Sequence, residues 1–95
     1  MLERDFQARL IKRLKNEFPD CFVLKNDPNY IQGIPDLTIL WHQRWAMIEV
    51  KKSEVARLRP NQRYYMLRAK DLSFGFIVYP ENEEDLFEEL HSYFD

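Results

Sequence analysis

Two short apolar runs joined by a very short connector constrain the fold of this chain more than any other feature. Leu37–Trp41 and Ala46–Val50 are rich in Val, Ile, Leu and Trp, a composition typical of strands. The connector around His42-Gln43-Arg44 is too short for anything but a hairpin. We therefore predict that these two strands are antiparallel neighbours in one sheet.

The remaining segments alternate between helical and strand patterns. Phe6, Leu10, Ile11, Leu14 and Phe18 recur at helical spacing and are followed by Pro19, which predicts an amphipathic first helix. The other expected elements are a strand at 21–25, a helix from residue 60 to about 71, a strand near 74–80 and an acidic amphipathic helix near 82–94. The resulting order, αβββαβα, predicts an α/β fold with a mixed central sheet flanked by helices.

Composition limits the class of protein. The 95 residues are 45% hydrophobic and 15% aromatic, which is enough for a single domain spanning 1–95 and too little for two. Three of the first five residues, Glu3, Arg4 and Asp5, are charged where a secretory signal is apolar, and no run approaches the ~18 apolar residues of a membrane span. We expect a cytoplasmic protein with no membrane partner. The single cysteine, Cys21, lies in an apolar run and is expected in the core.

Charge is distributed unevenly along the chain. The 14 basic and 16 acidic residues give a net charge of -2, but residues 81–95 contain seven acids and no Lys or Arg. The first 80 residues are therefore basic and the last 15 are acidic. This asymmetry permits a phosphate-binding face on the body, although ordinary solvated helices of differing charge explain it equally well.

The two acids of the hairpin segment form a pair. With the turn centred near Gln43, Asp36 falls opposite Glu49, because residues equidistant from a turn face each other. Glu49 and Lys51 project from one face of their strand, since side chains alternate along a strand. Two carboxylates ~4 Å apart repel by roughly 4 kcal/mol at an effective dielectric near 20. A protonated acid or a bound cation must therefore compensate.

Paired carboxylate oxygens are ligands that Mg²⁺ and Mn²⁺ prefer. A metal held there would favour phosphodiester hydrolysis, with Lys51 stabilising charge on the phosphate. The alternative is a surface salt-bridge cluster at a strand end, because Glu-x-Lys is common in strands. Spacing alone does not separate the two interpretations.

The motif residues carry a resemblance to a known family. Gly33-Ile34-Pro35-Asp36, followed thirteen residues later by Glu49-Val50-Lys51, together with the αβββαβα order, resembles the PD-(D/E)xK nuclease superfamily and, within it, the VRR-NUC family of virus-type replication-repair nucleases. The resemblance covers nearly the whole chain and implies a restriction-endonuclease-like core, similar to that of Holliday-junction resolvases. Two further matches are Glu3 on the first helix and Gln62 at the start of the second. Helical spacing puts Glu3 on one face with Leu10 and Leu14, so we expect its side chain to lean toward the sheet.

The resemblance implies a role for each of these residues. Asp36, Glu49 and the Val50 carbonyl would bind Mg²⁺, for which Mn²⁺ would substitute, with Glu3 completing the shell. Lys51 would be catalytic and Gln62 would orient it, a water or a phosphate oxygen. The implied enzyme is a metal-dependent, structure-selective DNA endonuclease of phage or replication-repair type, acting in a bacterial or phage-infected cell on branched, flap or four-way junction DNA. No small-molecule cofactor is expected.

Basic residues near the motif are candidates for binding the DNA backbone. They are Lys52, Arg57, Arg59 and Arg63 after the Lys51 strand, and Arg9, Lys12 and Arg13 on the first helix. Asn26 and the aromatic Tyr30 of the loop before the motif are further candidates. Four-way junctions have two-fold symmetry, so a homodimer is expected by analogy with the family.

A non-catalytic protein is the competing class. The net charge of -2 and the acidic last helix suit a protein-interaction domain, or a nucleic-acid-binding module that kept the nuclease fold. Restriction-type and exonuclease activities also remain open, as does the number of metal ions.

Overall fold

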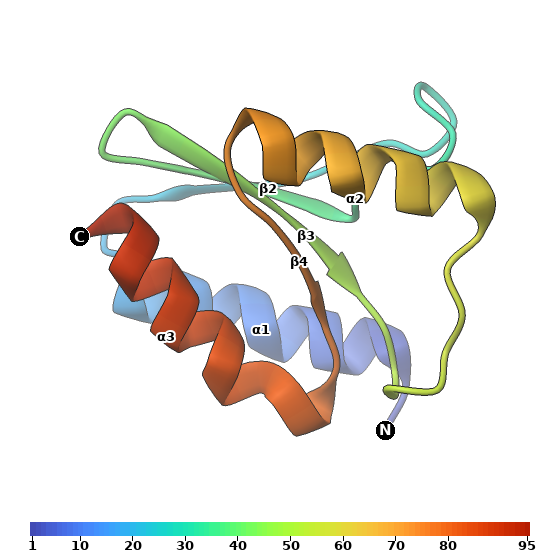
Figure 1. Ribbon diagram of the computed structural model, residues 1–95. Helices are drawn as coiled ribbons and strands as arrows, with labels where there is room; N and C mark the ends of the chain where they lie inside the picture. The colour runs from blue at the N-terminus through green and yellow to red at the C-terminus, as the bar shows by residue number, and fades with distance from the viewer.

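The computed structural model describes residues 1–95 as a four-stranded sheet with helices on both faces. The elements run α1 (Glu3–Glu17), β1 (Phe22–Lys25), β2 (Leu37–Trp41), β3 (Arg44–Val50), α2 (Pro60–Leu72), β4 (Gly75–Val78), the short 3-10 helix η1 (Pro80–Asn82) and α3 (Glu83–Phe94). Helices α1 and α3 lie on one face of the sheet, and α2 lies on the other (Figure 1). The predicted αβββαβα order and α/β class are confirmed.

The sheet is mixed, as predicted. Its strand order is β1-β2-β3-β4; β1, β2 and β3 are antiparallel neighbours, and β4 runs parallel to β3. The crossover from β3 to β4 passes through α2, as a parallel pair requires. Some boundaries differ from expectation: β1 begins at Phe22, β3 begins at Arg44, and β4 covers only Gly75–Val78. The short helix η1, which precedes α3, was not expected.

A two-residue turn explains the earlier start of β3. His42 and Gln43 have positive φ values of 51° and 63°, the conformation of the tight hairpin turns whose twist matches that of the strands. Pairing therefore continues up to Trp41 and Arg44. The register places Leu37 opposite Ile48, so Asp36 and Glu49 are the next facing positions toward the open end of the hairpin.

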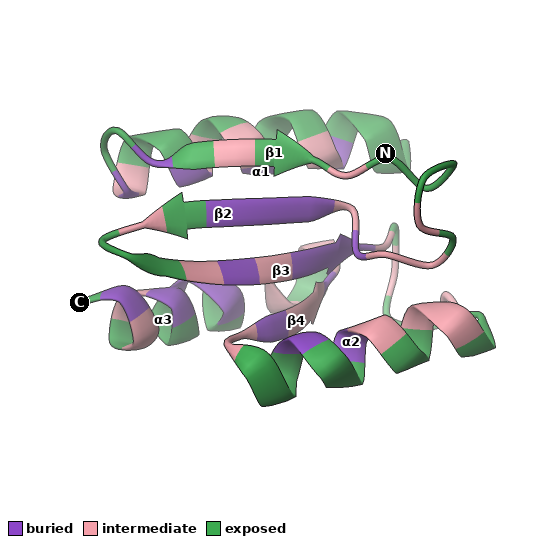
Figure 2. Cartoon of the chain, turned by 90° about the horizontal axis from the view of Figure 1, so that it is seen from above, coloured by how far each residue is buried: buried purple, intermediate pink, exposed green.

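The core lies between the sheet and the pair α1 and α3. Phe6, Leu10 and Leu14 of α1 are fully buried, and Leu86, Phe87, Leu90 and Phe94 of α3 are buried against the same sheet face. Cys21 belongs to this cluster, as predicted. Helix α2 covers only the β3 and β4 side of the other face, so β1 and the far half of β2 remain open there (Figure 2). None of the helices has the length and the apolar character that a membrane-spanning helix needs.

Candidate metal and phosphodiester site

Asp36 and Glu49 contact each other at the open end of the hairpin. The Asp36 N–H donates to Glu49 Oε1 at 3.2 Å, and the Val50 N–H donates to Asp36 Oδ2 at 2.8 Å. Each acid therefore accepts a backbone hydrogen bond from the strand that carries the other. The predicted proximity of the two carboxyls is confirmed, because the hairpin register leaves them opposite each other.

Strand β3 delivers Glu49 and Lys51 to the α2 side of the sheet. Ile48 and Val50 are fully buried, whereas Lys51 Nζ lies 3.3 Å from Glu49 Oε2. Glu49 is only 3% exposed, which is rare for an acid and normally requires a partner. Lys51 therefore forms a largely buried ion pair with Glu49, in agreement with the strand alternation predicted from sequence.

The environment of Glu49 opposes its ionisation. Burial, the largest cause, and the nearby Asp36 carboxylate together raise the pKa of the Glu49 carboxyl to about 7, and Lys51 offsets them only in part. A group with a pKa near 7 that sits beside a second carboxylate is a functional-site candidate on physical grounds. A divalent cation between the two acids would remove the repulsion.

Gln62 links this cluster to the start of α2. Its Nε2 donates to Glu49 Oε2 at 3.0 Å, and its Oε1 accepts from the Arg59 N–H at 2.9 Å. The Lys51 Nζ lies 3.4 Å from the same Oε1, a long contact. One side chain thus caps the first turn of α2 and orients the buried acid. Because Gln62 directly contacts Glu49 and Lys51, the structure brings together four of the five predicted catalytic residues.

The loop between β1 and β2 is held in place by Asn26. Its side-chain Nδ2 donates to the Pro35 carbonyl and to Thr38 Oγ1, both at 2.8 Å, and its N–H donates to the Asp36 carbonyl at 2.9 Å. These contacts close the eleven-residue connection, residues 26–36, and fix Asp36 just before the start of β2. Asn26 is therefore engaged in positioning the loop, whereas Tyr30 at its tip is 84% exposed.

Gly33 allows the same loop to approach α2. It has a φ of 93°, and a Cβ at this position would lie 2.7 Å from Asn61 Cγ and 2.8 Å from the Asn61 carbonyl carbon. The loop and the first turn of α2 enclose a hollow of about 260 Å³, whose lining includes Asp36, Arg59 and Gln62. The hollow therefore provides open space beside Asp36 and brings Arg59, which forms no ion pair, to the same place.

Glu3 does not join this group in the structure. It is exposed at the first position of α1, and no group of three or more His, Cys, Asp or Glu residues is arranged to hold a metal. The expectation that Glu3 leans toward the sheet is wrong for its side chain. The first turn of α1 precedes the buried stripe that begins at Phe6, so nothing packs Glu3 against the sheet.

The chemistry of the remaining donors fits a hard divalent cation. Asp36 and Glu49 supply carboxylate oxygens, and Val50, the third predicted ligand, is the last residue of β3 between Glu49 and Lys51. Asp36 Oδ1 accepts no hydrogen bond from the protein, whereas Asp36 Oδ2 and both Glu49 oxygens do. The protein thus provides two carboxylates and leaves several coordination positions for water or phosphate, an arrangement suited to Mg²⁺.

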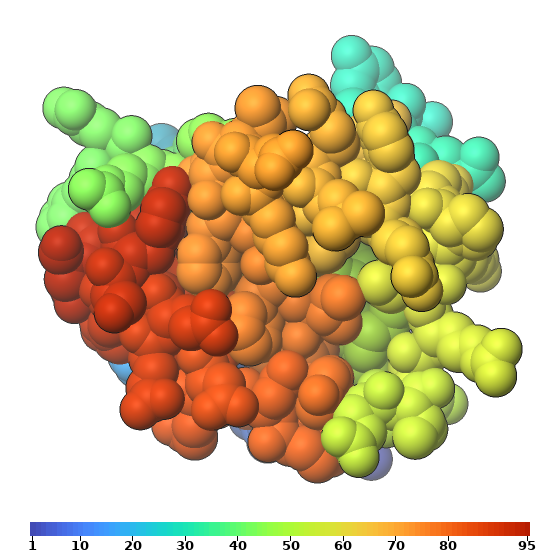
Figure 3. All heavy atoms as spheres, in the orientation of Figure 1, coloured from blue at the N-terminus to red at the C-terminus, as the bar shows by residue number.

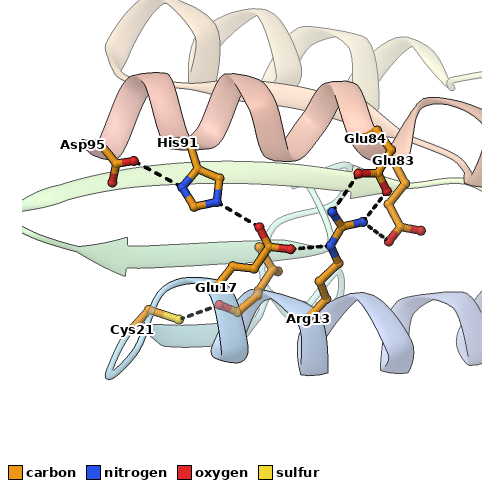
Figure 4. A network of polar contacts seen from close by, with 8 residues as sticks. Arg13, Glu17, Cys21, Glu83, Glu84, His91 and Asp95 are labelled. Atoms are coloured by element: carbon orange, nitrogen blue, oxygen red, sulfur yellow. Dashed lines mark hydrogen bonds and ion pairs between the residues drawn. The ribbon is translucent and has the colours of Figure 1, made fainter.

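The basic residues fall into two groups. Arg9 of α1 binds Glu83 of α3, and Arg13 of α1 binds Glu83 and Glu84 of α3. Arg13 also binds Glu17 of its own helix, and Figure 4 shows the three acids around Arg13. Their expected role in DNA binding is not supported, because the acidic tail folds against α1 and neutralises them. Lys52, Arg57, Arg59 and Arg63 form no ion pair and are exposed.

Sequence reasoning missed several residues of this region. Thr38 exchanges hydrogen bonds with Asn26 beneath the loop. Its presence as a lone polar residue in the apolar strand Leu37–Trp41 is the sequence feature that could have identified it. Asn61, Lys70 and Tyr79 line hollows beside the site, and nothing in their local pattern distinguishes them from ordinary surface residues.

Comparison of the chain with protein-family models, with curated proteins and with solved structures found no match. Function is therefore inferred from the geometry of the site and the chemistry of its residues.

Proposed function

We propose that this protein is a Mg²⁺-dependent, structure-selective DNA endonuclease that hydrolyses phosphodiester bonds at the Asp36 and Glu49 pair. The observation that carries the proposal is the buried Glu49, held between a second carboxylate and Lys51 and hydrogen-bonded by Gln62. Its spacing from Asp36 and Lys51 also resembles the PD-(D/E)xK motif of the VRR-NUC family. A solvated salt-bridge cluster explains this less well, because burying an acid beside another acid costs stability.

Asp36, Glu49 and the Val50 carbonyl would hold the cation. When bound, Mg²⁺ or Mn²⁺ supplies Lewis-acid chemistry that polarises a phosphoryl oxygen and offsets developing negative charge. In the reaction, a water oxygen bonds to phosphorus and the phosphorus–oxygen bond to the leaving alcohol breaks, which gives a phosphate monoester and an alcohol. No covalent intermediate with the protein is required.

The residues of the chain divide this work. Lys51 Nζ lies 3.3 Å from Glu49 Oε2, a position from which it would stabilise charge on the phosphate and position the water. Gln62 keeps Glu49 and Lys51 in place. Lys52, Arg57, Arg59 and Arg63 contact flanking phosphates and give salt-sensitive, sequence-independent binding. Selectivity then comes from DNA shape, and a homodimer would present two such sites to a junction.

A panel of linear, nicked, flap, splayed and four-way junction DNA, incubated with the purified protein and Mg²⁺, tests the proposal. We expect cutting of at least one branched substrate, dependent on Mg²⁺ or Mn²⁺ and absent in Asp36→Ala. An Asp71→Ala variant is the matched control, because Asp71 is an exposed acid at the end of α2. Equal cutting by wild type and Asp36→Ala would exclude this site.

A non-catalytic nucleic-acid-binding or protein-interaction module is the second candidate. Two observations favour it: Glu3 lies outside the acid pair, and every buried side-chain nitrogen and oxygen already has a hydrogen-bond partner. Either kind of module would not take up Mn²⁺ and would not cut any substrate of the panel, and only the nucleic-acid-binding module would bind DNA.

A further inference from the structure

A second hollow lies next to the proposed site. It has a volume of about 740 Å³, within the ~300–1,000 Å³ range of pockets that hold small ligands. It is bounded by the segment after β3, by α2 and by β4. In Figure 3 it opens between the yellow-green segment near residue 55 and the orange surface of α2 and β4. Lys51 lines it and is therefore shared with the acid pair.

The lining carries an excess of positive charge. Arg57 comes from the loop after β3, and Arg63 and Lys70 come from one side of α2, seven residues apart. All three are exposed and form no ion pair, in contrast to Arg9 and Arg13 on α1. Glu54 is the only acid in the lining. The hollow therefore attracts anions, and phosphate is the anion that the neighbouring site would present.

Aromatic side chains complete the lining. Tyr79 follows β4 and Phe76 lies within it, and both are half-buried and border the hollow. Gly75 brings α2 close to β4, because a Cβ there would lie 3.1 Å from Lys70 Cγ and 2.8 Å from Met66 Sδ. This close approach holds the aliphatic stem of Lys70 against the strand. A cationic groove with aromatic faces is the combination that binds single-stranded nucleic acid.

We infer that this hollow binds an unpaired nucleotide of the DNA strand next to the phosphate held at the Asp36 and Glu49 pair. Arg63 and Lys70 bind its phosphate, and its base stacks on Tyr79. A base in a continuous duplex is stacked and paired, so it cannot enter a hollow of this size without being unpaired. The inference deepens the proposed function, on which it rests: the substrate is DNA with single-stranded nucleotides beside the cut, such as a flap or splayed end.

Binding measured without divalent metal tests the inference independently of cutting. Fluorescence anisotropy in EDTA would compare a labelled single-stranded oligothymidylate with a blunt duplex of equal nucleotide number. We expect the single strand to bind more tightly than the duplex. Arg63→Ala and Lys70→Ala should each weaken single-strand binding about tenfold, as for a lost hydrogen bond to a charged group. Tyr79→Leu should weaken it about fivefold or more, as for a lost stacking contact.

Arg68→Ala is the matched control. Arg68 lies on the same helix, is exposed and does not line the hollow, so its removal changes only the general charge. Equal losses in Arg63→Ala and Arg68→Ala, or equal affinity for single strand and duplex, would overturn the inference. Arg63 and Lys70 are exposed, so these variants carry the test even where Tyr79→Leu unfolds. Selective binding of the single strand without any cutting would support the nucleotide-binding hollow and contradict the proposed nuclease activity. Cutting without selective binding would support the nuclease activity and contradict the nucleotide-binding hollow.

Discussion

Lys51 Nζ lies 3.3 Å from Glu49 Oε2, and the exposed fractions of the two side chains are only 13% and 4%. Glu49 lies on β3 and Lys51 directly follows its last residue, Val50, so continued strand alternation brings the two side chains to the same face. This ion pair is partly desolvated and shares Glu49 with Asp36, which leaves Lys51 as the only cation in direct contact with the acid pair.

Removal of Lys51 should slow catalysis strongly without unfolding the protein. We expect Lys51→Ala to lower the rate of single-turnover cleavage by about 100-fold or more, the range seen when one group that stabilises transition-state charge is lost. Lys15→Ala, an exposed lysine of α1, is the matched control and should keep the wild-type rate. A Lys51→Ala protein that cuts at the wild-type rate would remove Lys51 from the mechanism.

Gln62 should act as a positioning residue. Gln62→Leu keeps the size of the side chain but loses its hydrogen bonds to Glu49 and to the Arg59 N–H. We expect a 10–100-fold loss in metal affinity or activity, about the effect of removing a group that orients a ligand. The Mg²⁺ concentration for half-maximal cutting should rise, whereas a purely structural role would lower stability and leave that concentration unchanged.

The raised pKa of Glu49 predicts a pH-dependent stability. Burial raises this pKa to about 7 from an ordinary value of 4.5, so the folded state binds a proton more tightly than the unfolded state. Its contribution to stability is present below about pH 4.5 and is lost as the pH rises through about 7. Between about pH 5.5 and about pH 8, the free energy of unfolding should fall by about 2 kcal/mol more in wild type than in Glu49→Gln.

Urea denaturation of the two proteins across this range measures the difference, and the subtraction removes other titrating groups. His91 is one of these, since its hydrogen bond to Glu17 raises its pKa despite partial desolvation, and Asp95 adds to the effect. Mg²⁺ binds ionised carboxylates, so it should stabilise wild type more at high pH than at low pH. Parallel stability curves for wild type and Glu49→Gln would contradict the raised pKa.

The close approach at Gly33 should not tolerate a side chain. Gly33→Ala places a Cβ in the left-handed region and 2.7 Å from Asn61, so we expect a loss of about 1–3 kcal/mol in the free energy of unfolding. The displaced α2 start should also reduce cutting, because Gln62 is the next residue after Asn61. A denaturation midpoint unchanged from wild type would show that the loop packs differently.

The α1 and α3 contact should matter for stability and not for DNA. Arg13 binds three acids and its guanidinium lies 3.9 Å from the Phe87 ring centroid, so Arg13→Ala should cost about 1–2 kcal/mol of unfolding free energy. DNA affinity should stay within twofold of wild type or increase. A marked loss of DNA affinity in Arg13→Ala without a loss of stability would contradict this prediction and indicate that α1 contacts DNA.

The sequence predicts the fold well where the contacts join residues that are close in the chain. The short connector determines the hairpin register, and that register brings Asp36 to Glu49. Strand alternation then places Lys51 beside Glu49. Helical periodicity identifies the buried stripe of α1, because Phe6, Leu10 and Leu14 recur every four residues within one helix.

Contacts between distant segments could not be predicted. The pairing of Arg13 with Glu83 and Glu84 depends on α3 lying beside α1, which no local pattern states. The positions of Asn61 and Lys70 likewise depend on how closely α2 approaches Gly33 and Gly75. The exposure of Glu3 differs from the expectation that its side chain leans toward the sheet. Helical spacing gives a direction around the helix axis, but it does not show where along the helix the contact with the sheet ends.

Isothermal titration calorimetry with Mn²⁺ at about pH 7.5, where Glu49 ionises readily, tests the central claim most directly. The acid pair should take up Mn²⁺ in the wild-type protein, and uptake should be lost in Asp36→Ala while the Asp71→Ala control retains it. Heat of binding that is absent in wild type, or that persists unchanged in Asp36→Ala, would contradict a metal site at Asp36 and Glu49.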